Sequence, residues 1–203
     1  LSAGNTQYQE FFATEYKMLS TLRNFPKAVI VMMDGYVLGG GFGLAQACHI
    51  KVTSEKSRFA MPETAIGFFP DVGATHFLSR LDEVGVYMAL TGEQISSSDA
   101  LYLDLVDYHV PSERFAELEA ALITAPVLNS IEIQKIISGY ITHPVESELQ
   151  KRADLINQHF GYPNLKEIEQ SLAHTSNSTD QEWASKMLAI LQQRPVMAKQ
   201  TSL

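Results

Sequence analysis

The amino-acid sequence predicts an α/β fold, a core of short strands and helices that is followed by an all-helical region. Three observations support this prediction. Short apolar, β-branched runs of strand length occur up to residue 110. Three consecutive glycines join one of these runs to a helical pattern, and beyond Ala125-Pro126 every periodic pattern is helical. We therefore predict two regions, a core over residues 1–125 and a helical region over residues 126–203.

The core begins with a helix and continues with strands. Apolar residues at helical spacing predict an amphipathic helix over residues 6–24. The continuous run at 28–33 is typical of a strand buried on both faces, and a second short strand at 36–38 leads into a helix that ends at Cys48. The remaining patterns predict strands at 49–53, 58–61 and 105–110, and helices at 74–80, 83–90, 97–103, 111–124, 128–140, 146–159, 164–173 and 180–193.

The composition is that of a globular chain. Of its 203 residues, 45% are hydrophobic and 19% are charged, which excludes a disordered polyampholyte. Fifteen Lys and Arg against 23 Asp and Glu give a net charge of -8, so nucleic-acid partners are disfavoured. No apolar run is long enough to span a membrane, and we expect no membrane partner. The single cysteine, Cys48, cannot form an internal disulfide, and we interpret it as a core residue in a reducing compartment.

The glycines at positions 39, 40 and 41 are the first candidate site. Glycines between a strand and a helix allow a ligand to approach the backbone closely and leave N–H groups free to bind developing negative charge. The segment lacks the lysine of a phosphate-binding loop, so it suits a carbonyl oxyanion better than a polyphosphate. The alternative is a tight turn that serves only helix packing.

Two carboxylates, Glu63 and Asp71, lie eight residues apart within a stretch rich in glycine, proline and apolar residues. Burial can separate the pKa values of two such groups so that they divide acid and base roles. The alternative is a surface glutamate at the start of a short helix and a surface aspartate in a turn. The six histidines are scattered without metal-ligand spacing, and no nucleophile elbow occurs, so we predict neither a metal site nor a serine hydrolase.

Three segments together resemble a known family. They are DGYVLGGGFGLA at 34–45, FAMPETAIGFFPDVG at 59–73 and LTGEQI at 90–95. The segments resemble the enoyl-CoA hydratase/isomerase (crotonase) superfamily, and within it they are most similar to the branch that hydrolyses 3-hydroxyisobutyryl-CoA. The resemblance is specific over residues 27–125 and general over residues 126–203.

The resemblance implies a crotonase-like core, a superhelix of ββα turns that binds an acyl-CoA. In this family two backbone N–H groups hold the thioester carbonyl, and the matching donor here is Gly40, with Gly39 and Gly41 beside it in the substrate site. The second donor belongs to a loop that has no counterpart in residues 1–203. We therefore expect a core truncated at its N-terminus, a chain that also lacks its C-terminal end, and a fragment that is nearly inactive alone.

The resemblance also implies roles for side chains. Hydratases carry a glutamate where this chain has Gly43, so the two-glutamate machinery for water addition is absent. Glu63 matches the second catalytic glutamate, and Asp71 matches the aspartate of the hydrolase branch. We expect Glu63 to act at the thioester, as nucleophile or as base, and Asp71 to bind the 3-hydroxyl of the acyl group.

The predicted function is hydrolysis of 3-hydroxyisobutyryl-CoA to 3-hydroxyisobutyrate and CoA, a step of valine degradation. CoA is part of the substrate, so no separate cofactor is expected. A homo-oligomer is expected from the family, in the cytoplasm of a bacterium or in the mitochondrial matrix of a eukaryote. Two alternatives stay open, an enoyl-CoA hydratase/isomerase and a non-catalytic crotonase-fold assembly module. Candidates to hold the CoA phosphates are Lys27, Lys51, Lys56 and Arg58.

Overall fold

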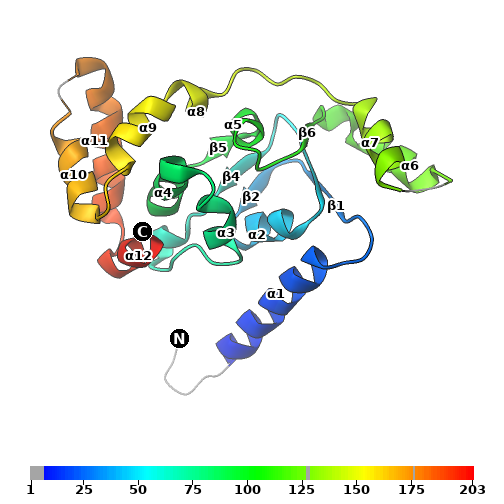
Figure 1. The fold of residues 1–203 in the computed structure, drawn as a ribbon, viewed down its shortest axis with the longest axis horizontal. Coiled ribbons are helices and arrows are strands. Elements are labelled where there is room, and N and C mark those ends of the chain that lie inside the picture. The colour runs from blue at the N-terminus through cyan, green and yellow to red at the C-terminus, as the bar shows by residue number, and fades with distance from the viewer. Residues whose placement is uncertain (1–6, 127–128, 176) are drawn as a thin grey trace.

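The computed structural model describes residues 7–126, 129–175 and 177–203. Two small sheets lie at the centre of an elongated molecule, with α6 and α7 at one end and α9 to α11 at the other (Figure 1). No helix of the described ranges has both the length and the apolar character needed to cross a membrane. In chain order the elements are α1 (Gln7–Arg23), β1 (Ile30–Met33), β2 (Tyr36–Leu38), α2 (Gly40–Ala47), β3 (Ile50–Thr53), β4 (Arg58–Ala60), the 3-10 helix η1 (Glu63–Ile66), α3 (Ala74–Leu78), α4 (Asp82–Thr91), β5 (Ile95–Ser96), α5 (Ser97–Tyr102), β6 (Tyr108–His109), the 3-10 helix η2 (Ser112–Arg114), α6 (Phe115–Thr124), α7 (Ser130–Ser138), α8 (Glu148–Lys151), α9 (Ala153–Phe160), α10 (Leu165–Ala173), α11 (Ser178–Gln193) and α12 (Val196–Ser202).

The first four strands alternate between the two sheets. One sheet has the order β1-β3-β6 and is parallel, with Ile30 opposite Ile50 and Val52 opposite Tyr108. The other has the order β2-β4-β5, in which β2 and β4 are parallel and the short β5 is antiparallel. Each of the first two passes, β1-β2 and β3-β4, therefore adds one strand to each sheet before the chain enters a helix, which is the predicted ββα turn. In the last pass α5 lies between β5 and β6.

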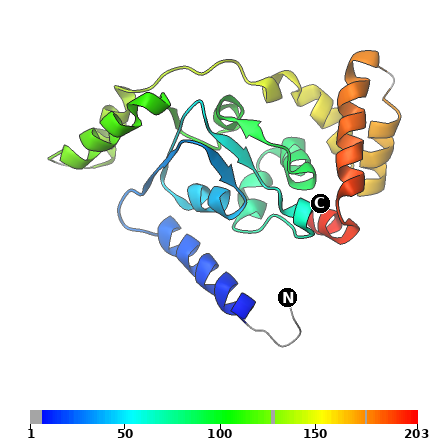
Figure 2. The same ribbon diagram turned by 180° about the vertical axis from the view of Figure 1, so that it is seen from behind.

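One large apolar core joins the sheets to the later helices. Phe42 of α2 and Phe59 of β4 are completely buried in it, and so are Met88 of α4 and Leu191 of α11. Helices α9, α11 and α12 pack on α4, and Figure 2 shows this group from the opposite side. A second, smaller cluster lies between β3, β6, α6 and α7 and is centred on Leu118. Because the large core includes residues on both sides of position 125, the later helices contribute directly to the burial of the sheet region.

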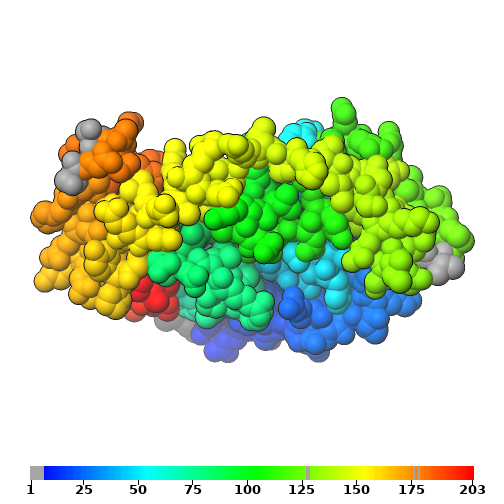
Figure 3. Space-filling view, turned by 45° about the horizontal axis from the view of Figure 1, so that its top comes forward, coloured from blue at the N-terminus to red at the C-terminus, as the bar shows by residue number. Residues whose placement is uncertain are grey.

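A long connection between α7 and α8 runs across the face of the molecule in Figure 3. Its end is tied to the core by Asp99, a buried residue in the first turn of α5. Asp99 Oδ1 accepts hydrogen bonds from Ser147 Oγ at 2.7 Å and from the Leu149 backbone N at 2.9 Å. Its Oδ2 accepts from the Ser96 backbone and hydroxyl, which completes a capping box at the start of α5.

The predicted α/β fold with ββα turns is confirmed, and several boundaries are corrected. The strand expected at 105–110 is reduced to Tyr108–His109, because Leu105 N bonds to Ala100 O and so belongs to the turn that ends α5. The helix expected at 146–159 is divided at Arg152 into α8 and α9. Strand β5 and helix α12 were not predicted. Residue 128 of the helix expected at 128–140 lies outside the described residues, and α7 begins at Ser130.

Candidate active site

The fold buries the Glu63 side chain against the glycine turn. Glu63 opens η1 directly after β4 and is only 8% exposed. Its Oε1 lies 2.7 Å from the position that a Cβ atom on Gly39 would occupy. Its buried Oε2 has no hydrogen-bond partner among the described residues. The alternative of a surface glutamate is therefore wrong, and one carboxylate oxygen is free to meet a ligand.

Gly39 holds a backbone conformation that favours glycine. Its φ is 52°, and its N–H bonds to Ala60 O at 2.9 Å, which links the turn to β4. The Gly39 carbonyl accepts from the N–H groups of Phe42 and Gly43. The N–H groups of Gly40 and Gly41 lie in the first turn of α2, where no helical carbonyl can accept them. The start of α2 therefore offers two backbone donors beside Glu63, in a position that favours negative charge.

Asp71 joins this site through Tyr16 of α1. Tyr16 Oη donates a 2.7 Å hydrogen bond to Asp71 Oδ2, and Asp71 is half-buried. The next residue, Val72, has a φ of 46°, so the chain turns sharply just after the carboxylate. Glu15 also faces the site, because its Oε1 lies 3.1 Å from the Cβ position of Gly40. Three carboxylates and a phenol thus surround the first turn of α2.

The environment of the cluster favours the protonated forms of Glu63 and Glu15. The pKa of Glu63 is raised to about 7 in total: burial raises it most, a hydrogen bond from its own backbone N–H opposes this rise, and the charge of Asp71 adds to it. Burial and then Asp71 raise the pKa of Glu15. Burial, the hydrogen bond to Asp71 and the nearby negative charges raise the pKa of Tyr16 to about 12. Tyr16 therefore stays a neutral donor to Asp71, and Glu63 changes its charge near neutral pH.

A packing contact explains why position 43 is a glycine. A Cβ atom on Gly43 would lie 2.7 Å from Val72 O and closer still to the Val72 side chain. Atoms of different residues do not approach so closely, so Val72 occupies the space that a larger residue at position 43 would need. A glutamate at position 43 could be accommodated only if the turn after Asp71 moved.

An aromatic cluster fixes α1 against the site. Phe12 stacks on Phe68 with ring centroids 5.9 Å apart, and it stacks on Tyr16 at 5.8 Å. Phe68 in turn stacks on Phe69 at 4.5 Å. No residue of α1 is fully buried, so these ring contacts, with the Tyr16–Asp71 bond, hold the helix to the loop that follows η1.

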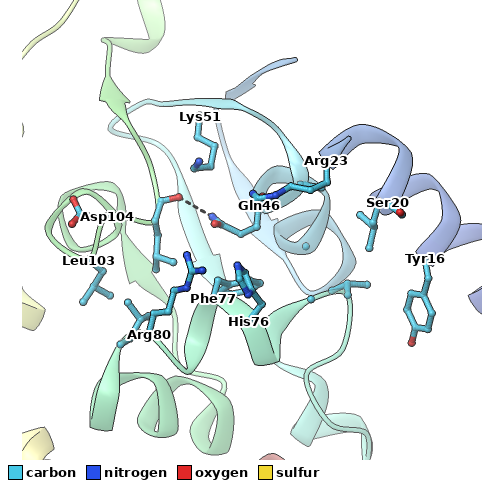
Figure 4. Close-up of a pocket in the computed structure, with 17 residues that line it drawn as sticks. Tyr16, Ser20, Arg23, Gln46, Lys51, His76, Phe77, Arg80, Leu103 and Asp104 are labelled. Carbon is cyan, nitrogen blue, oxygen red and sulfur yellow. Dashed lines mark hydrogen bonds between the residues drawn. The ribbon is translucent and has the colours of Figure 1, made fainter. Parts of the chain in front are cut away.

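A cavity of about 670 Å³ opens next to this cluster, between α1, α2, α3 and the turn after α5. Tyr16 lies at one edge of the cavity, and Val72 and Gly73 line it directly after Asp71. Figure 4 shows Lys51 and Arg80 pointing into it from opposite sides of Gln46. The cavity is within the size range of small-molecule sites.

The structure brings together the candidates named from the sequence and adds two. Gly39, Gly40, Glu63 and Asp71 share one site, and Gly41 follows them in the first turn of α2. Glu15 and Tyr16 were missed, because helical spacing over residues 6–24 predicts only an amphipathic helix and not which of its side chains reach the site. Cys48 is buried as predicted. Within the described ranges, no three histidine, cysteine or acidic side chains gather as metal ligands.

Comparisons with known proteins show the family to which the chain belongs. The chain matches the enoyl-CoA hydratase/isomerase family over residues 1–203. It is 35% identical over 176 residues to "3-hydroxyisobutyryl-CoA hydrolase, mitochondrial" of Gallus gallus, a match that covers 84% of this chain and 46% of the relative. It is 33% identical over 184 residues to "3-hydroxyisobutyryl-CoA hydrolase 1" of Arabidopsis thaliana, covering 89% of this chain and 49% of the relative. The chain therefore spans about half the length of these curated relatives.

Solved structures have the same fold. A carnitinyl-CoA dehydratase from Mycobacterium thermoresistibile superposes with a TM-score of 0.88 at 26% identity, over 98% of this chain and 56% of that one. An enoyl-CoA hydratase from Rhodobacter sphaeroides superposes with a TM-score of 0.83 at 31% identity, over 97% of this chain and 55% of that one. The family match over the whole sequence and these superpositions lead to one conclusion: the chain belongs to the enoyl-CoA hydratase/isomerase (crotonase) family.

Proposed function

We propose that this protein hydrolyses acyl-CoA thioesters and that its substrate is 3-hydroxyisobutyryl-CoA. The observation that carries the proposal is the position of Glu63, whose buried carboxylate lies beside the free N–H groups that begin α2. An acid in this place can act on a carbonyl carbon while the backbone stabilises the carbonyl oxygen. The names of the curated relatives point to the same reaction and the same substrate.

The proposed reaction begins with the thioester carbonyl oxygen at the N–H of Gly40. Ionised Glu63 then either attacks the carbonyl carbon or takes a proton from a water molecule that attacks it. In both routes the carbon–sulfur bond breaks and CoA leaves as the thiol after it gains a proton. In the first route the Glu63–acyl anhydride is then cleaved by water, which restores the carboxylate.

Asp71 is proposed to accept a hydrogen bond from the 3-hydroxyl of the acyl group. Tyr16 occupies one of its oxygens, Oδ2, and we propose that the other oxygen meets the substrate. An acyl-CoA that lacks the hydroxyl would leave this carboxylate without its hydrogen-bond partner. A site of this kind therefore discriminates strongly between substrates with and without the hydroxyl. We propose that this hydrogen bond gives the enzyme its preference for a 3-hydroxyacyl substrate.

The decisive experiment is CoA release by the full-length protein, measured as free thiol. Glu63→Gln keeps the size of the side chain and removes its charge, so we expect thiol release from 3-hydroxyisobutyryl-CoA to be abolished. Glu119→Gln on α6 makes the same chemical change at an exposed position and should keep the wild-type rate. Full activity of Glu63→Gln would overturn the proposal.

The second candidate function is hydration or isomerisation of an enoyl-CoA. It is favoured by the two solved structures described above, which are a carnitinyl-CoA dehydratase and an enoyl-CoA hydratase. The contact between Gly43 and Val72 argues against it, because that contact fills the place of the second glutamate. Loss of enoyl absorbance without thiol release would favour this candidate over hydrolysis.

A further inference from the structure

The segment that carries Glu63 rests on the end of α4. Thr64, the next residue of η1, is completely buried, and its hydroxyl donates a hydrogen bond to Leu90 O at 3.2 Å. Gly92 follows α4 with a φ of 67°, and a Cβ atom on it would lie 3.0 Å from Pro62 Cα. The residues on both sides of Glu63 therefore contact the last turn of α4 and the residue that follows it.

The last carbonyl groups of α4 need partners from outside the helix, because no further helical N–H follows them. Leu90 O has the Thr64 hydroxyl. Thr91 O accepts a hydrogen bond of 2.7 Å from Arg194 Nη2. Since Thr91 is completely buried, its carbonyl oxygen cannot turn to bulk water instead. Arg194 therefore completes the end of the helix on which η1 rests.

Arg194 reaches α4 from a corner far along the chain. It directly follows α11, and Pro195 separates it from α12. The Cγ atom of Pro195 lies 3.6 Å from the Cβ position of Gly67, which ends η1 with a φ of 79°. Helix α12 itself packs on η1 and on α4, as the view from behind shows (Figure 2). The corner between α11 and α12 thus holds η1 directly through Pro195 and indirectly through Arg194.

A second cation from α11 reaches the same region in a different way. Lys186 pairs with Glu93 Oε2 at 2.6 Å, but its side chain is 60% exposed and its partner is a side chain rather than a carbonyl of α4. The Nε of Arg194, by contrast, is buried and has no hydrogen-bond partner among the described residues. The bond to Thr91 O is therefore the polar contact that orients the Arg194 side chain.

From this series of contacts we infer that Arg194 is a positioning residue for Glu63, because it fixes the end of α4 and the end of α4 fixes η1. The inference rests on the proposed role of Glu63 in hydrolysis. A reacting group that is misplaced by about 1 Å can lose on the order of a hundredfold in rate, even when the change that displaces it is distant. Arg194 acts through intervening residues, so its loss should lower kcat and leave substrate binding largely intact.

The first measurement is thiol release from 3-hydroxyisobutyryl-CoA by variants of the full-length protein. Arg194→Met keeps an unbranched side chain and removes the donor, so we expect kcat to fall about tenfold or more with little change in KM. Arg194→Lys keeps a charged donor and should recover most of kcat. Lys186→Gln breaks the other link between α11 and the turn after α4, and it should keep the wild-type kcat.

The second measurement follows η1 without turnover, by hydrogen exchange and mass spectrometry. The amides of Ala65, Gly67 and Phe68 all bond to carbonyl oxygens of residues 62–64, so their exchange reports the order of this segment. We expect faster exchange there in Arg194→Met, and also in Thr64→Val, which removes the other bond to the end of α4. Helix α6 belongs to the separate apolar cluster, so its amides should exchange as in the wild type.

Unchanged exchange at η1 in Arg194→Met would overturn the inference, and so would a wild-type kcat in this variant. An equal loss of kcat in Lys186→Gln would also overturn it. Faster exchange throughout the chain, α6 included, would show that Arg194 only stabilises the fold. A wild-type protein that releases no thiol would overturn the proposed function instead, because the exchange measurement still decides whether Arg194 fixes η1.

Discussion

Tyr16 Oη donates a 2.7 Å hydrogen bond to Asp71 Oδ2 across 55 residues of sequence. The bond connects the first helix to the loop that carries the second candidate acid. Because the pKa of Tyr16 is raised to about 12, mainly by burial and by this bond, the phenol remains a donor at neutral pH. One Asp71 oxygen, Oδ2, is therefore held in place by a neutral donor.

The first prediction concerns this bond. Tyr16→Phe removes the donor that holds Asp71, which in the proposed function binds the 3-hydroxyl of the substrate. We expect kcat/KM for 3-hydroxyisobutyryl-CoA to fall about tenfold or more, as for loss of a hydrogen bond to a charged group. The rate with isobutyryl-CoA, which has no 3-hydroxyl, should change little. Tyr36→Phe, which alters a phenol on the surface, is the matched control. An equal loss with both substrates would contradict the orienting role.

The second prediction concerns pH. If ionised Glu63 is the nucleophile or the base, kcat rises about tenfold for each pH unit below its pKa and levels off above it. That pKa is raised to about 7, by burial first and by Asp71 as well. Asp71→Asn removes the negative charge, so the acid limb of the residual activity should move to lower pH. A pH–rate profile measures both effects, and a limb that stays in place or moves to higher pH would refute the coupling.

The third prediction compares two neighbouring glycines. An alanine at Gly39 would take an unfavourable positive φ and place its Cβ atom 2.7 Å from Glu63 Oε1. We expect Gly39→Ala to lower the free energy of unfolding by about 1–3 kcal/mol from the backbone alone, and by more from the contact. Gly41→Ala meets no atom within 4 Å. It should leave stability unchanged or raise it by up to about 1 kcal/mol, since alanine favours the helix. Urea denaturation distinguishes the two variants, and equal effects would contradict this geometry.

The fourth prediction concerns Asp99 and acid stability. Burial raises its pKa, but the hydrogen bonds from Leu149, Ser147 and Ser96 more than compensate, and the net effect is a lowered pKa. A group with a depressed pKa stabilises the fold above its unfolded pKa of about 3.9, and this stability is lost as the pH falls through the folded value. Asp99→Asn should therefore lower the free energy of unfolding by about 1.5–3 kcal/mol at pH 7.

The difference between Asp99→Asn and the wild type should shrink in acid, because the wild-type carboxylate is then protonated as well. Asp154→Asn on α9 makes the same change at an exposed position and should have little effect at any pH. Denaturation curves from neutral pH to about pH 3 give the comparison. A difference that stays constant across this range would show that the charge of Asp99 does not stabilise the fold.

By itself the sequence determined the order of strands and helices, the glycine turn and two of the acids. These features are local. Hydrophobic spacing marks a helix such as α1, a β-branched run marks β1, and the motif around Glu63 and Asp71 lies within one continuous stretch. The two-residue strand β5 was missed because so short a segment has no period of its own.

Only the tertiary structure decided which distant groups meet. It buries Glu63 against Gly39, brings Glu15 and Tyr16 to the same place, and fills the space at Gly43 with Val72. It also gathers three basic residues around one cavity. Periodicity along a chain reports which face of an element is apolar, whereas pKa shifts and side-chain contacts depend on the burial that packing creates. The acids could therefore be named from the sequence, but their environment could not.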